Sequence, residues 1–259
     1  MLTRRELLAS GLVLVGYSGV RAPWRGQSSE SFERQKGDPD LPYETVTYDG
    51  QMIRDLAERS GKASFERWDS QLPSAMLIKA RGFIGASRLH TPERIAPLLE
   101  VFGLALKDGD GRYVPFCAAG LSYCGLSAYA DSVRGGYSAA DRVKVLRQLA
   151  ADVEHYYFYP TVSCNDMALI ARAKRRWRAP DDLPKPGWIV LFDWEKSGRP
   201  DHCGVVERAT QQSFFTVEFN TATGSGSQRN GGVVAERNRT SYREFVAGYI
   251  ATDLSPTVI

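Results

Sequence analysis

Hydrophobic and polar side chains alternate along the last third of the chain, beyond the Pro-Lys-Pro-Gly segment at residues 184–187. Period-two runs separated by turn residues are typical of an antiparallel sheet. The predicted strands cover residues 188–194, 202–209, 214–220, 232–238 and 245–251. The sequence therefore predicts a five-stranded, mainly antiparallel sheet.

Before residue 184 the apolar positions follow helical spacing instead. A helix is predicted over 47–61, and another begins at Thr91, which is followed by a proline that suits the first helical position. Small residues at 117–130 predict a helix packed closely beneath the sheet, and residues 138–178 form a helical insertion. The chain is thus predicted to be α+β, with N-terminal helices packed on the sheet.

The N-terminus carries Arg4 and Arg5 before a glycine-diluted apolar stretch at 7–20, which is short for a membrane span. It resembles a twin-arginine export signal. This predicts a periplasmic or extracellular protein, and if Pro23 prevents cleavage the segment stays as a membrane anchor. The predicted organisation is a signal at 1–22, a flexible linker at 23–44, a helical lead-in at 45–115, a catalytic domain at 116–251 with an insertion at 132–184, and a tail at 252–259.

The formal net charge argues against a nucleic-acid partner. Removal of residues 1–22 takes away three arginines and one glutamate, so the charge falls from +3 to +1. Binding to nucleic acid by counterion release requires a basic patch. The basic run at residues 174–178 is interpreted as the solvated end of a helix, where cations complement the helix dipole.

Export would place the 4 cysteines in an oxidising compartment. Cys117 and Cys124 lie on one predicted helix, about 10 Å apart along its axis, so they cannot form a disulfide. A bridge between Cys124 and Cys164 is possible, but free buried thiols are favoured. No local spacing of His, Cys or carboxylate residues predicts a zinc site, so neither a metal nor another cofactor is expected.

A thiol, an imidazole and a carbonyl-bearing group follow one another in an order suited to cysteine hydrolases, as Cys117, His202 and Asn220. If residues 211–212 form a hairpin turn, His202 lies opposite Asn220 and Glu218. Asn220 is predicted to orient the imidazole, and Glu218 to support its positive charge.

Two further residues are predicted to line a substrate groove. Asp166 lies on a helix that begins near Ser163, and Trp194 ends a strand that leads into the site.

The segments FCAAGLSYC, KPGWIVLFDW, DHCGVVE and TVEFNTATG occur in an order that resembles the CHAP family of cysteine, histidine-dependent amidohydrolases and peptidases. The resemblance covers about residues 116–249 and implies a papain-like fold. It implies that Cys117 is the nucleophile, His202 the general base, and Glu218 and Asn220 polar partners of the imidazole. It also implies hydrolysis of an amide bond in peptidoglycan through a thioester. Cys203 departs from the pattern, because the family has a small aliphatic residue there.

Three alternatives remain open from the sequence. The protein can be a catalytically idle wall-binding protein that keeps the fold, or an amidase for a small soluble amide. An NlpC-type peptidase uses a second histidine as the orienting group, and the absence of any histidine after His202 disfavours it.

Overall fold

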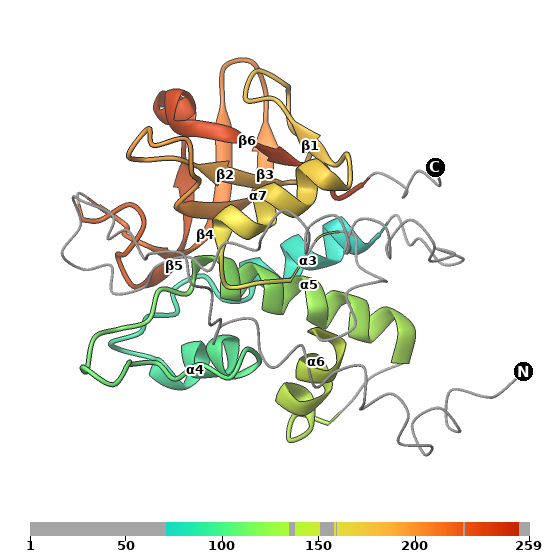
Figure 1. The fold of residues 1–259 in the computed structure, drawn as a ribbon, viewed down its shortest axis with the longest axis vertical. Coiled ribbons are helices and arrows are strands. Elements are labelled where there is room, and N and C mark those ends of the chain that lie inside the picture. Colours follow the sequence, from blue (N-terminus) through green and yellow to red (C-terminus); the bar gives the residue numbers. More distant parts are fainter. Residues whose placement is uncertain (1–70, 135–137, 151–157, 159, 225, 254–259) are drawn as a thin grey trace, which may run out of the picture. The chain divides into compact units, whose positions relative to one another are not determined.

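A computed structural model describes residues 71–134, 138–150, 158, 160–224 and 226–253, and shows an α+β protein (Figure 1). The α-helices are α3 (Leu72–Arg81), α4 (Pro92–Glu100), α5 (Cys117–Arg134), α6 (Arg142–Ala150) and α7 (Cys164–Ala173). The strands are β1 (Trp177–Arg178), β2 (Ile189–Phe192), β3 (His202–Ala209), β4 (Phe214–Thr221), β5 (Val233–Asn238) and β6 (Val246–Ile250), and the 3-10 helix η2 (Thr240–Phe245) precedes β6.

Several sequence predictions concern other parts of the chain. The signal at 1–22, the linker at 23–44, the helix at 47–61 and the last six residues of the tail lie outside the described residues. None of the helices in the described ranges combines the length and the apolar composition that a bilayer crossing requires.

The strands form one open sheet in the order β1-β6-β2-β3-β4-β5, and every neighbouring pair is antiparallel. This confirms the antiparallel sheet, and each of the five predicted strands begins and ends within two residues of its predicted limits. One face of the sheet carries a buried apolar cluster formed by Trp188, Val190, Phe192, Val206, Phe214, Val246, Tyr249 and Ala251. The opposite face packs on α5, which contacts β3 and β4.

The sheet has a sixth strand that the sequence analysis did not predict. Strand β1 has two residues and pairs with the end of β6, where Trp177 lies opposite Ile250. It falls within the basic run 174–178, which was interpreted as a solvated helix end. That interpretation is wrong for Arg176, which is 4% exposed.

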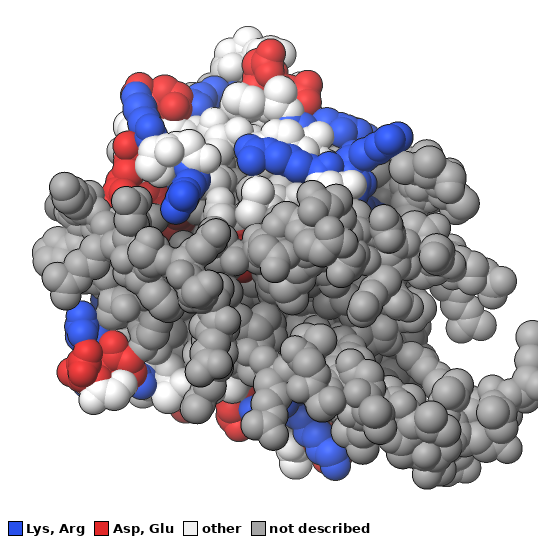
Figure 2. Space-filling model, in the orientation of Figure 1, with Lys and Arg blue, Asp and Glu red and all other residues white. Residues whose placement is uncertain are grey.

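Surface charge over this region is nevertheless basic. Figure 2 shows Lys and Arg side chains gathered where α7 and β1 lie, whereas both signs of charge occur elsewhere on the described surface of this face.

Helix α5 lies beneath the sheet and also contacts α3, α4 and α6 (Figure 1). Close approach to the sheet depends on Gly120, because a Cβ at this position would overlap the ring of Phe219 on β4. The small residues of this segment therefore allow α5 to pack closely beneath the sheet, as the sequence predicted. Since α3 and α4 also pack on α5, the described part of the lead-in belongs to the same core as the predicted catalytic domain.

Replacement of Gly120 by alanine tests this close packing. The new methyl group must displace either α5 or the Phe219 ring, and overpacking of this kind costs about 1–3 kcal/mol. This outweighs the better helix propensity of alanine, which favours the variant by about 1 kcal/mol. Urea denaturation should show a lower free energy of unfolding for Gly120→Ala, and Phe219→Leu in the same chain should recover part of it. A more stable single variant would contradict the contact.

The predicted insertion at 132–184 contains α6, α7 and β1. Helix α6 packs on α5, whereas α7 contacts β1. The first residue of α7, Cys164, lies beside the first residue of α5, Cys117, with 3.7 Å between their sulfur atoms. The insertion thus contributes a side chain to the region where the sequence places the nucleophile.

Candidate active site

Cys117 is the first residue of α5, and the extended segment 114–116 leads into it. Its side chain is buried, and a thiol at a helix N-terminus is stabilised as a thiolate by the positive end of the helix dipole. Hydrogen bonds from Cys164, and next from Cys203, hold the pKa of Cys117 well below its usual value. Burial opposes this shift, and His202 contributes to it by hydrogen bonding and by its charge. Cys117 is therefore placed to react as a thiolate.

His202 begins β3 and is completely buried. Its Nε2 lies 2.9 Å from Oε2 of Glu218, so Nδ1 is the ring nitrogen that remains for Cys117. Nδ1 makes no well-formed hydrogen bond within the described residues, yet the thiol and the imidazole influence each other's titration. Burial alone would lower the pKa of His202, but its interactions with Cys117 and Glu218 raise the pKa to about 9.

Glu218 on β4 makes a diagonal contact with the imidazole of His202 on the neighbouring strand β3. It lies opposite Gly204 in the β3–β4 register, two residues from His202 on the same face of the sheet. A Cβ on Gly204 would come within 2.7 Å of Cγ of Glu218. Glycine at 204 therefore leaves the space through which the carboxylate reaches His202.

A buried arginine holds the Glu218 carboxylate. Arg239 Nε donates to Oε1 at 2.7 Å and its Nη2 donates to Oε2, while Thr216 Oγ1 donates to Oε1 at 2.6 Å. Burial alone would raise the pKa of Glu218, but Arg239 and His202 lower it to about 2. Glu218 is thus ionised and fixed, as a group that orients an imidazole must be.

Arg239 was missed by the sequence analysis, although it directly follows the predicted strand at 232–238. It is 0% exposed, and its guanidinium carbon lies 4.9 Å from the ring centre of Trp194 and 5.4 Å from that of Tyr242. An arginine near a strand end is normally solvated. Only the tertiary structure shows that this one is enclosed by aromatic rings and a carboxylate.

Asn220 does not orient His202, which corrects the sequence prediction. Its backbone has φ +59°, and the β4–β5 register shifts between Glu218 and Thr221. This irregularity turns the side chain toward the following loop, where Nδ2 donates to the carbonyl oxygen of Arg229 at 3.0 Å. The imidazole is hydrogen-bonded to Glu218 instead.

Asp166 is not exposed at an open groove. Its backbone N–H donates to Oγ of Ser163, the N-cap of α7, and its carboxyl is 3% exposed. Burial raises its pKa to about 7, against a lowering contribution from the Ser163 hydrogen bond.

Trp194 stacks on Phe192 with 5.1 Å between ring centres and covers Arg239. It thus belongs to the aromatic enclosure of the buried arginine. Contact of either Asp166 or Trp194 with substrate stays a prediction.

The described residues also form a small pocket near Asn220. It has a volume of about 240 Å³ and is lined by Arg88, Arg112, Tyr113 and Asn230. Tyr113 lies shortly before Cys117 in the chain, and Arg88 Nη1 lies 3.4 Å from Oδ1 of Asn220. Cationic side chains therefore line the pocket, and Asn220 at the end of β4 contacts one of them, Arg88.

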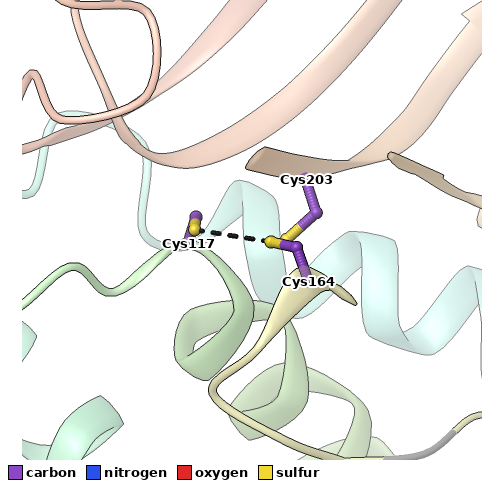
Figure 3. A group of neighbouring side chains, drawn as sticks. All are labelled: Cys117, Cys164 and Cys203. Carbon is purple, nitrogen blue, oxygen red and sulfur yellow. Dashed lines mark hydrogen bonds between the residues drawn. The ribbon is translucent and has the colours of Figure 1, made fainter. Parts of the chain in front are cut away.

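Three cysteines from three separate elements meet at this site (Figure 3). The sulfur atoms of Cys117, Cys164 and Cys203 all lie within 4.8 Å of one another, and all three residues are buried. The sequence analysis expected no metal site because no local spacing indicated one, and these three thiols come from the separate elements α5, α7 and β3. All 4 cysteines are free thiols, as the sequence analysis favoured, and Cys124 lies outside the group.

No family model matches this chain, and no curated protein matches it. The crystal structure of Ly7917 is similar to this chain with 17% sequence identity and a TM-score of 0.34. The similarity covers 69% of this chain and 61% of the Ly7917 chain, so this chain spans less than two thirds of Ly7917.

Proposed function

We propose that this protein is an exported cysteine amidase or endopeptidase with a papain-like, CHAP-like catalytic domain, and that it hydrolyses an amide bond in peptidoglycan. The observation that carries the proposal is the set of contacts from His202 through Glu218 to Arg239, together with a buried Cys117 thiol whose pKa is lowered in part by His202. It supplies a nucleophile, a base and a fixed orienting group, the three components that thiol hydrolysis requires.

In the proposed reaction the Cys117 proton passes to Nδ1 of His202, and the thiolate sulfur attacks the carbonyl carbon of the amide. Backbone N–H groups at the start of α5 stabilise the negative oxygen of the tetrahedral intermediate. The imidazolium gives its proton to the leaving nitrogen as the C–N bond breaks, which leaves a thioester and a free amine. Water, deprotonated by His202, then releases the carboxylic acid and regenerates the thiol.

The substrate class rests on the resemblance described above and is supported by one cationic side chain in the small pocket. Peptidoglycan peptides carry carboxylates, and Arg88 offers charge of the opposite sign, whereas Arg112 is already paired with Asp108 and Asp110. The scissile bond lies either within the stem or cross-bridge peptide or between the lactyl group and L-alanine.

Digestion of purified peptidoglycan tests this function. The released fragments would be identified by mass spectrometry for the wild-type protein, for Cys117→Ala and for Cys124→Ala, which removes another buried thiol of the same helix. We expect fragments with new amine and carboxyl ends from the wild type and from Cys124→Ala, and none from Cys117→Ala. Equal release by all three proteins, or by none, would contradict the proposal.

The pH dependence of hydrolysis should reflect the raised pKa of His202. The imidazolium is needed to protonate the leaving nitrogen, and it is lost as the pH rises through about 9. We therefore expect kcat/KM on a soluble wall fragment to stay constant through neutral pH and to decline near pH 9. Because Cys117 and His202 titrate together, the apparent pKa of this decline belongs to the pair. A decline centred near pH 6.5, where an unperturbed histidine titrates, would contradict this assignment.

A further inference from the structure

The three-cysteine group has a geometry that suits a metal ion. In a tetrahedral zinc site the Zn–S bonds are about 2.3 Å, which places neighbouring sulfur atoms about 3.8 Å apart. The sulfur atoms of Cys117 and Cys164 are 3.7 Å apart, and the Cys203 sulfur lies within 4.8 Å of both.

The surroundings of the group favour thiolate ligands. Cys117 and Cys164 are the first residues of α5 and α7, so the positive ends of two helix dipoles meet at the sulfur atoms. A coordinating thiol must lose its proton, and the helix dipoles favour this at Cys117 and Cys164. The hydrogen bond with Cys117 nevertheless raises the pKa of Cys164, and burial raises the pKa of Cys203, so these two thiols would lose their protons only to the bound ion.

We propose that Cys117, Cys164 and Cys203 bind one thiophilic metal ion of the Zn²⁺ class, and that the bound ion blocks the nucleophile. Sulfur donors select such ions over Mg²⁺ or Ca²⁺, which prefer oxygen. Each coordinating thiol releases its proton to solvent. Binding depends only on the thiol geometry, whereas the blocking effect rests on the proposed function of Cys117.

Zn²⁺ titration of the reduced, metal-stripped protein in competition with a chromophoric chelator tests the site. The wild type should bind one ion per chain, and Cys164→Ser and Cys203→Ser should each weaken binding at least about 100-fold, since loss of even an outer partner of a ligand costs 10–100-fold. Cys124→Ser is the matched control, because it removes a buried thiol that lies outside the group, and it should bind as the wild type does.

A measurement on the unmutated chain keeps the test independent of variant folding. Co²⁺ in place of Zn²⁺ should give the sulfur-to-metal charge-transfer absorption of several thiolate ligands, and Zn²⁺ should abolish it. Absence of stoichiometric binding by the wild type, or equal loss of affinity in Cys124→Ser, would overturn the metal site.

The activity readout separates this inference from the proposed function. We expect Zn²⁺ to inhibit peptidoglycan hydrolysis over the concentration range in which it binds, and a chelator to restore it. Binding at the three thiols without any hydrolysis, in metal-free or metal-loaded protein, would support the metal site and contradict the hydrolase.

Discussion

Replacement of Cys117 or His202 by alanine should reduce kcat on a wall fragment by roughly four orders of magnitude or more, as the loss of one member of a nucleophile–base pair does in other hydrolases. The two losses should not add, because the thiol and the imidazole act as one unit. The double variant should therefore be about as slow as either single one, which steady-state kinetics on all three proteins would measure.

Cys124→Ala is the control for this prediction. It lies on the same helix and is equally enclosed, but burial raises the pKa of its thiol, with only a small opposite contribution from Lys79. Activity retained in Cys117→Ala, or activity lost to the same degree in Cys124→Ala, would show that the reaction does not use the Cys117 sulfur.

Replacement of Glu218 by glutamine should have the largest effect on stability. It leaves the Arg239 guanidinium buried without its counter-charge, and breaking one partner of such a pair costs about 3–5 kcal/mol. It also removes the fixed acceptor of His202 Nε2, so kcat should fall as well. Urea denaturation and kinetics on the same preparations would measure both effects.

Asn220→Gly is the variant to compare with Glu218→Gln. Glycine accepts the left-handed backbone at this position without strain, so the variant removes only the side chain. It should lower kcat far less than Glu218→Gln does. A larger kinetic effect at Asn220 than at Glu218 would restore the sequence-based assignment of the orienting group.

The comparison of Asn220 with Glu218 shows where the sequence pattern stops being informative. Alternation along β4 and the hairpin register correctly bring Glu218 near His202, but the backbone of Asn220 departs from the regular strand. The choice between them depends on a bulge and a positive φ, which no period-two pattern reveals.

Elements with strong local signals were predicted well. The strands have alternating side chains and clear turn residues, and α5 begins at Cys117, shortly after a proline that keeps the preceding segment extended. Strand β1 has only two residues, too few to show an alternation of apolar and polar side chains. It is defined by its pairing with β6.

The burial of Arg239 and the meeting of the three cysteines depend on contacts between distant segments. Cys117 and Cys164 are 47 residues apart, and Cys203 comes from another element again. Metal-site motifs are recognised by short spacings within one segment, so a site assembled from three helix and strand ends leaves no such signature.

The pH dependence of Cys117 alkylation by iodoacetamide, in the presence of a chelator, tests the activated thiol most directly. Because the pKa of Cys117 lies well below its usual value, its alkylation rate should stay nearly constant from pH 7 to pH 9 and should drop in His202→Ala. Mass spectrometry of the labelled peptides would distinguish Cys117 from the other cysteines. A rate that rises about tenfold per pH unit up to the ordinary thiol pKa near 8.5, and that is the same in His202→Ala, would contradict the account.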